Sequence, residues 1–283
     1  MFTDGPVTPL HLETLIEVLR RLGTRKATRE TLYGMFQPKG VADSQEQSKV
    51  VIRTAIDLDL VIEREGSELE LTESGKGRRS VRECVLDAFH KRVLSKTDVE
   101  YYFALFYSYM LGLNGDAVKD NRDDWAMAFN RDVFGNTKQA NPFNAEKWSG
   151  IHRWLVFAGL GWNDPSDTFQ CNPFERLKRK LPNIFGEEKK LDDDTFMDRL
   201  ATECPELDGG VIFKQANRNA SDSRFCTLGL SHALTQLHLE NRIELHCSPD
   251  SGGWSLKQAS PPIDGKSLLS DRIDFVVIKK GAK

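Results

Sequence analysis

Three amphipathic helical segments followed by a strand-like alternation, all within residues 10–73, constrain the fold of this chain most strongly. Apolar residues recur at helical spacing in residues 10–22, 28–36 and 45–58. Directly after them, residues 60–72 alternate at the two-residue period of a strand, around the turn Glu65-Gly66-Ser67. This order predicts three packed helices closed by a small β-hairpin.

Three helices and a hairpin in this order are typical of the winged helix-turn-helix, which places its third helix in the major groove of DNA. Winged helices also serve as protein–protein modules, so the scaffold alone names no activity. A similar order returns near the C-terminus, where the helix-to-wing junction at residues 237–245 parallels the one at residues 55–63. The segments of this second unit are two helices (195–204 and 228–239), a hairpin (243–247 with 254–256) and a last strand (273–278).

The segment between these units is helical and rich in aromatic residues. Residues 98–111 are apolar nearly all round, which predicts a helix buried on several sides. We therefore expect a mainly α fold with small β-wings, in which two winged-helix units flank a helical middle domain. The expected domains are residues 1–80, 81–190 and 191–283.

Composition limits the cellular setting and the partners. The 283 residues carry a net charge of −3, which argues against a chain that coats nucleic acid nonspecifically. No apolar run reaches the roughly 18 residues of a membrane span, and the N-terminus lacks the pattern of a secretion signal. The five cysteines are scattered, which is typical of reduced thiols. We expect a cytoplasmic protein with no membrane contact.

Candidate contacts to duplex DNA gather on the third helix, around the wing and in a basic run after residue 174. The third helix is expected to expose polar side chains, including Thr54, that reach base edges or phosphates. The full set is Gln45, Gln47, Ser48, Lys49, Arg53, Arg64, Lys76, Arg78, Arg79, Lys178, Arg179 and Lys180.

Acidic residues oppose this DNA interpretation. The wing carries glutamates that repel phosphate, namely Glu63, Glu65, Glu68 and Glu70. In the C-terminal unit the polar residues of the last helix are sparse, although Arg218 and Arg224 precede it and could contact phosphate. That unit is therefore expected to dock another protein subunit.

The aromatic residues of the middle segment have two interpretations. Trp148, Trp154, Phe157 and Trp162 lie near helical spacing, which favours packing in a core. The alternative is a stacking platform for single-stranded DNA, beside the basic run of residues 176–180.

Nothing in the sequence has the spacing of a metal or catalytic site. Cys226, His232, His238, His246 and Cys247 fit no zinc-ligand pattern, because the histidines alternate with apolar core residues. Asp116, Asp120, Asp123 and Asp124 lack the lysine-bearing strand that accompanies a nuclease metal cluster. Phosphate-binding glycine loops, nucleophile elbows and metalloprotease motifs are also missing. We expect no enzyme activity, no cofactor and no metal.

One short motif resembles a known family. The pattern Asn141-Pro-Phe-Asn, Trp148, Arg153-Trp154 and Gly159-Leu-Gly-Trp162, set after an N-terminal winged helix, looks like the DpdG-type proteins of bacterial defence islands. Those islands mark DNA with 7-deazaguanine derivatives. The resemblance implies a non-catalytic accessory subunit of a restriction complex that acts on unmodified DNA, alongside ATPases and nucleases.

Together these observations predict a DNA-binding or adaptor subunit of a bacterial antiphage defence or restriction complex. Its partners would be duplex DNA and other protein subunits. Two alternatives remain open: a pure protein-interaction subunit without DNA contact, and a winged-helix transcription regulator that acts as a homodimer.

Overall fold

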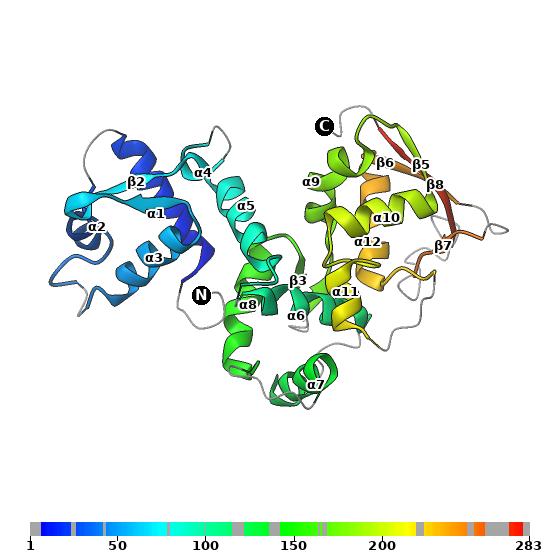
Figure 1. Ribbon diagram of the computed structural model, residues 1–283, viewed down its shortest axis with the longest axis horizontal. Helices are drawn as coiled ribbons and strands as arrows, with labels where there is room; N and C mark the ends of the chain where they lie inside the picture. The colour runs from blue at the N-terminus through cyan, green and yellow to red at the C-terminus, as the bar shows by residue number, and fades with distance from the viewer. Residues whose placement is uncertain are drawn as a thin grey trace. The chain divides into compact units, whose positions relative to one another are not determined.

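A computed structural model describes most of the chain (Figure 1), in the ranges 7–23, 27–41, 44–77, 80–98, 100–114, 122–135, 142–163, 165, 169–218, 224–247, 252–257 and 272–279. It is mainly helical with small antiparallel sheets. Two compact units divide it: residues 1–103 with 146–157, and residues 104–145 with 158–283. The predicted three-part division stays a prediction.

The first unit begins with the three expected helices: α1 (Pro9–Leu22), α2 (Arg29–Phe36) and α3 (Glu46–Asp57). Thr8 starts α1 because its hydroxyl accepts a hydrogen bond from the His11 N–H, and Thr28 caps α2 in the same way. Each helix turns its apolar stripe inward, and the buried members are Leu12, Leu15, Ile16, Leu19, Leu32, Val51, Ile52 and Ala55. Packing of these stripes, rather than helix propensity, stabilises the three helices.

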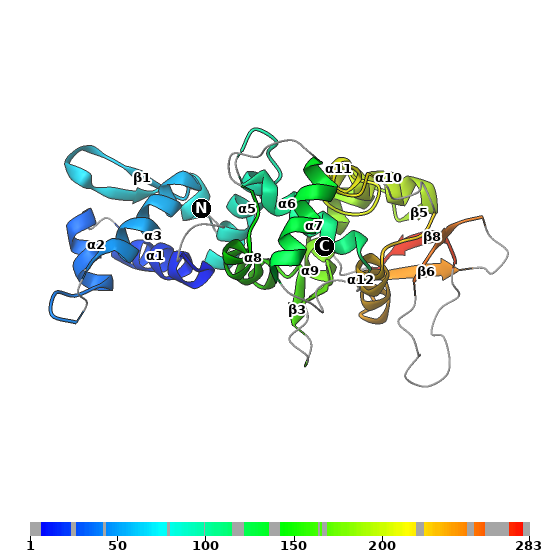
Figure 2. The ribbon, with the colours of Figure 1, turned by 90° about the horizontal axis from the view of Figure 1, so that it is seen from below.

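The predicted hairpin follows directly. Strand β1 (Val61–Glu63) pairs antiparallel with β2 (Leu69–Leu71) around a short 3-10 turn, η1 (Glu65–Ser67). The N–H of Leu69 donates to the Ala27 carbonyl at 2.7 Å, which ties the hairpin to the residue before the α2 cap. Figure 2 shows the hairpin along one side of these helices.

Helices α4 (Glu73–Lys76), α5 (Val81–Val93) and α8 (Ala145–Phe157) complete the first unit, together with the start of α6 (Tyr101–Gly112). Their core is aromatic. The Phe89 ring stacks on Trp154 with centroids 5.3 Å apart and meets Phe103 edge-on at 4.8 Å. Trp154 is only 1% exposed, so the core interpretation is confirmed for this residue.

The rest of α6 and helix α7 (Arg122–Phe134) begin the second unit. As predicted from its apolar sequence, α6 is buried along nearly its whole length. Phe106 stacks on Phe143 at 4.3 Å, and Phe129 meets both rings edge-on. The Tyr107 hydroxyl donates to the Leu160 carbonyl at 3.0 Å, which satisfies this buried polar group beside a second hairpin. That hairpin joins β3 (Gly161–Asn163) to β4 (Phe169–Cys171).

The C-terminal part of the second unit combines helices with a four-stranded sheet. Strands β5, β8 and β6 are neighbours in that order, and β7 pairs with β8. Helix α10 packs against β8, and α12 packs against β6 and α9. The elements are α9 (Phe174–Phe185), β5 (Lys190–Asp192), α10 (Asp193–Glu203), α11 (Val211–Ala216), α12 (Leu228–Leu239), β6 (Ile243–Cys247), β7 (Trp254–Ser255) and β8 (Arg272–Ile278).

The pairing of these strands differs from the sequence-based expectation. We expected β6 and β7 to form a hairpin, but both pair with β8 instead. Strand β8 has seven residues and buries Ile273 and Val276, so it offers β6 a longer antiparallel ladder than the two-residue β7 does. The predicted last strand at residues 273–278 is confirmed as β8.

Candidate nucleic-acid interface and basic pocket

The exposed face of α3 is a narrow charged stripe made of Glu46, Lys49, Arg53 and Asp57. Both cations have an acidic neighbour on the same helix. Lys49 Nζ lies 2.6 Å from Glu46 Oε1, and Arg53 Nε lies 4.0 Å from Asp57 Oδ2. The hydrogen bond that Lys49 donates to Glu46 raises the pKa of Lys49. The stripe is therefore charged but balanced, and a phosphate would have to compete with these carboxylates.

Two residues expected on this face are buried, which corrects the prediction. Ser48 and Thr54 are each 3% exposed. The Ser48 hydroxyl and its N–H both donate to Gln37 Oε1, at 2.7 and 2.8 Å. Both residues lie on the same side of the helix as Val51 and Ile52, so helical geometry turns them toward the core.

The two glutamines of the predicted set make contacts within the first unit. Gln47 Nε2 lies 3.2 Å from His11 Nε2, and Gln45 Nε2 donates to the Gln37 carbonyl at 3.5 Å. Both are half-buried. They flank the stripe of α3 and are partly engaged in holding the helix in place.

The predicted cations of the hairpin region are also paired. Arg64 Nε lies 3.2 Å from Glu70, and Lys76 Nζ lies 3.3 Å from Glu73. Glu63 accepts two hydrogen bonds from Arg29, at 2.7 and 2.6 Å, and these bonds lower its pKa. Arg78 and Arg79 lie outside the described residues.

The basic run of α9 is divided between core and surface. Arg176 is buried and its Nε donates to Glu206 Oε1 at 2.7 Å. Lys180 lies 3.0 Å from Glu203, and Lys178 lies 3.6 Å from Glu175 and 3.9 Å from Glu240. Arg179 is half-buried and also has an interaction partner. The predicted contacts Lys178, Arg179 and Lys180 therefore do not form a free basic face.

The helix of the second unit that parallels α3 is covered. In α12 the buried residues include Leu230, Ser231, Leu234 and Leu237. A Cβ at Gly229 would come within 2.6 Å of the Leu111 side chain and 2.7 Å of the Cys171 carbonyl, so only glycine permits this close approach. Only a narrow side of α12, with the half-exposed His232, Thr235 and Gln236, is left in contact with solvent.

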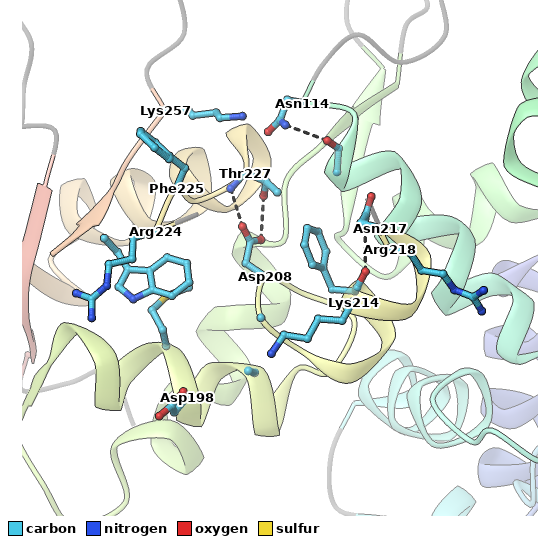
Figure 3. Close-up of a pocket in the computed structure, with 16 residues that line it drawn as sticks. Asn114, Asp198, Asp208, Lys214, Asn217, Arg218, Arg224, Phe225, Thr227 and Lys257 are labelled. Carbon is cyan, nitrogen blue, oxygen red and sulfur yellow. Dashed lines mark hydrogen bonds between the residues drawn. The ribbon is translucent and has the colours of Figure 1, made fainter. Parts of the chain in front are cut away.

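The second unit holds a cavity of about 570 Å³ beside the start of α12 (Figure 3). We call it the basic pocket. Its lining residues come from five separate segments of this unit. They are Gly112, Asn114, Met197, Asp198, Ala201, Asp208, Gly209, Phe213, Lys214, Asn217, Arg218, Arg224, Phe225, Thr227, Trp254 and Lys257.

A buried carboxylate lies at the centre of this lining. Asp208 is 3% exposed and accepts hydrogen bonds from both the N–H and the hydroxyl of Thr227, at 2.6 and 2.9 Å. Burial raises the pKa of Asp208 to about 6, although the Thr227 hydrogen bonds act in the opposite direction. Since Thr227 also caps α12, this pair fixes the start of the helix beside the pocket.

Sequence reasoning identified only part of this pocket. It named Arg218 and Arg224 as possible phosphate contacts, and both line it. It missed Lys214, Phe225 and Lys257. These residues lie on a helix, in an isolated β-bridge and after a strand, and no regular spacing in the sequence relates the three positions. The adjacent pair Arg224 and Phe225 was the only local feature of the sequence that pointed to this pocket, and Phe225 is exposed in the structure.

The two groups of residues considered and rejected as metal ligands in the sequence lie partly outside the described residues. Asp116 and Asp120, and the Cys247 side chain, lie outside the described residues. Within the described parts of the chain, no three histidine, cysteine or acidic side chains come together as metal ligands. The described helices also include none with the length and apolarity to cross a bilayer.

Comparison with known proteins gives one match. A family model described as DpdG-like matches residues 4–251, which is most of the chain. No curated protein matches the sequence. No solved structure matches it either.

Proposed function

The chain belongs to the DpdG-like family, and on this premise we propose that it is a non-catalytic DNA-binding adaptor subunit of a bacterial antiphage defence or restriction complex. In this proposal the first unit contacts duplex DNA and the second docks partner subunits. The carrying observation is the arrangement of α1, α2, α3 and the β1–β2 hairpin, with a polar stripe on α3. That arrangement supports the winged-helix assignment of the first unit.

The charges of the first unit favour an adaptor over an autonomous DNA-binding protein. Lys49 and Arg53 must exchange Glu46 and Asp57 for phosphates, and the hairpin glutamates oppose that exchange. Electrostatic attraction to phosphate supplies most nonspecific affinity, so weak and salt-sensitive binding follows. A partner that also holds DNA would raise the effective affinity by linking the two contacts.

The covered α12 supports the second half of the proposal. Most of α12 is packed inside the unit, and unlike α3 this helix carries neither lysine nor arginine. Its surface is therefore assigned to protein subunits.

The DNA contact is tested by removing the stripe cations from the full chain. Lys49→Ala with Arg53→Ala should weaken binding to a duplex of about 30 base pairs, followed by fluorescence anisotropy from 20 to 200 mM salt. Each lost phosphate contact should reduce the slope of log K against log salt by about 0.9. The control is Arg21→Ala with Lys91→Ala, which removes the same charge from other exposed positions of the first unit.

A further variant includes the two arginines after the hairpin. Replacing Lys49, Arg53, Arg78 and Arg79 together should abolish a salt-sensitive gel shift. Equal binding by the double variant and its control would reject the α3 contact.

The acidic hairpin favours a second candidate, a protein-interaction subunit without DNA contact. In that case the purified chain would show no DNA binding at low salt but would co-purify with other subunits from its native host. A winged-helix regulator is the remaining alternative, and it requires a homodimer that binds a specific duplex. Sedimentation of the chain with and without DNA separates it from the adaptor.

A further inference from the structure

The lining of the basic pocket carries more cationic than acidic side chains. Lys214 on α11 and Arg218 just after it are exposed, and Lys257 follows β7. Among the described residues none of these three forms an ion pair or a side-chain hydrogen bond. In Figure 3 Lys214 and Lys257 lie on opposite sides of Asp208, while Arg218 extends away from it. A cavity whose lining has more cations than carboxylates is suited to an anionic ligand.

The other charged groups of the lining do not cancel these cations. Arg224 is held by Asp193 and Asp194, at 3.5 and 2.6 Å, so it contributes little free charge. Asp208 is buried with both oxygens bound by Thr227. Asp198 is exposed on α10. Lys214, Arg218 and Lys257 therefore outnumber the two carboxylates of the lining, Asp198 and Asp208.

An aromatic surface accompanies the charge. Phe225 is 58% exposed although it is a large apolar residue, and its backbone is fixed by a bridge to Ser255. Cys226 N–H donates to the Ser255 carbonyl at 2.8 Å, and Ser255 N–H donates to the Arg224 carbonyl at 2.7 Å. The ring is thus presented on a rigid backbone next to Lys257 (Figure 3). A fixed, exposed ring beside cations is the arrangement on which nucleic-acid bases stack.

The remaining polar groups make the pocket rigid. Asn217 Nδ2 donates to the carbonyls of Ser108 and Phe213, at 2.9 and 3.1 Å. Asn114 Oδ1 accepts from the N–H of Leu228 at 2.9 Å. These bonds join α6, α11 and α12 around a cavity whose volume of about 570 Å³ lies within the range of small-molecule sites.

We propose that the basic pocket binds a nucleotide unit, with the phosphate between Lys214 and Lys257 and the base stacked on Phe225. The nucleotide could be free or could be an unpaired residue of a DNA strand, since both present a phosphate and an aromatic base. The site is independent of α3, because all of its residues belong to the second unit. An acidic peptide would satisfy the cations but would leave Phe225 without a stacking partner.

The test is isothermal titration calorimetry on the full chain at low salt. The probes are dAMP, deoxyadenosine, inorganic phosphate, a pentanucleotide of deoxyadenosine and a hexaglutamate peptide. We expect dAMP to bind at least about ten-fold more tightly than phosphate or deoxyadenosine, because only dAMP engages both the cations and the ring. Tighter binding of the pentanucleotide than of dAMP assigns the site to a DNA strand, and equal binding assigns it to a free nucleotide.

Three variants locate the binding. Phe225→Ala should weaken dAMP binding by about 5- to 100-fold, as expected for one lost base-stacking contact, and leave phosphate binding unchanged. Lys214→Gln with Lys257→Gln should weaken both ligands by about ten-fold or more. Lys189→Gln, at an exposed lysine of the same unit outside the pocket, should change neither.

Three results would overturn the proposal. One is phosphate binding as tightly as dAMP, and another is the peptide binding more tightly than the nucleotides. The third is dAMP binding that survives both pocket variants, provided that their circular dichroism matches the parent chain. Lys49→Ala with Arg53→Ala leaves the pocket intact. A failure of the proposed duplex contact on α3 is therefore distinguishable from a failure of the proposed nucleotide site.

Discussion

Helices α3 and α12 occupy similar places in the chain, since each is the last of three helices before a strand, yet they meet different surroundings. Helix α3 exposes a stripe of Glu46, Lys49, Arg53 and Asp57. Helix α12 buries most of its surface in the rest of its unit, is half-exposed at His232, Thr235 and Gln236, and exposes Leu239 at its end. The same order of elements therefore yields one helix available to a partner and one that serves as core.

The sequences of the two helices explain this difference. In α12 the small residues Gly229, Ser231 and Ala233 allow neighbouring backbone and side chains to approach closely. In α3 the long charged side chains remain in water and only one face is apolar. The candidate ligand site of the second unit consequently lies in the basic pocket beside α12 rather than on α12 itself.

The largest expected difference between the two regions concerns their ion pairs. Arg176 and Glu206 are 5% and 3% exposed, whereas Arg29 and Glu63 are 30% and 33% exposed. Glu206→Gln should destabilise the second unit by about 3–5 kcal/mol, because it leaves a buried guanidinium without its counter-charge. Glu63→Gln should cost about 1 kcal/mol or less. Urea unfolding with hydrogen exchange resolved by peptide measures both.

A double substitution serves as the control for that pair. Arg176→Met with Glu206→Leu removes both charges, so it should recover much of the stability lost in Glu206→Gln. Similar losses of unfolding free energy from Glu206→Gln and Glu63→Gln would show that burial does not make one ion pair more important for stability than the other.

The two regions should also respond in opposite directions to pH. The folded pKa of Asp208, about 6, exceeds the ordinary aspartate value, so the folded state binds this proton more tightly than the unfolded state does. Its contribution to stability is complete below about pH 4 and is lost as the pH rises through 6, at a cost of about 3 kcal/mol. For Glu63 the lowered pKa has the reverse effect, and stability is lost as the pH falls.

Asp208→Asn isolates this effect, because an amide still accepts the Thr227 N–H bond but does not titrate. The parent chain should lose stability relative to the variant between pH 4 and 7, measured by urea unfolding at each pH. A constant difference across that range would show that Asp208 does not change its charge on folding.

Helix capping gives the smallest expected contrast. Thr8→Ala removes the cap of α1 and should cost about 1 kcal/mol. Thr227→Ala removes the cap of α12 and also the hydroxyl that donates to buried Asp208, so it should cost about 2–3 kcal/mol. Hydrogen exchange at the first turn of each helix reports the two effects, and equal losses would contradict the added role of Thr227.

The sequence predicted local elements better than it predicted their partners. Helices α1, α2, α3 and α12 follow from apolar periodicity, which depends on neighbours a few residues away. The pairing of β6 with β8 depends on residues far apart in the chain, and alternation alone does not choose between possible partners. Periodicity also left Ser48 on the wrong face, because a serine carries no apolar signal although Gln37 satisfies it inside.

The pocket was still harder to predict, because its residues are also far apart in the chain. Arg218 and Arg224 were visible as cations before a helix, but Lys214 and Lys257 have no periodic relation to them. The proposed DNA contacts on α3 stay a prediction, since exposure and charge are compatible with binding but do not measure it.

The division of the chain has a consequence for its synthesis on the ribosome. The first unit needs residues 146–157 of α8, where Trp154 stacks on Phe89. Its aromatic core therefore cannot close until the ribosome has released residue 157, after residues 104–145 of the second unit have already emerged. The nascent chain must hold Phe89 without its Trp154 stacking partner throughout that interval, which is the period when such a chain depends most on chaperones.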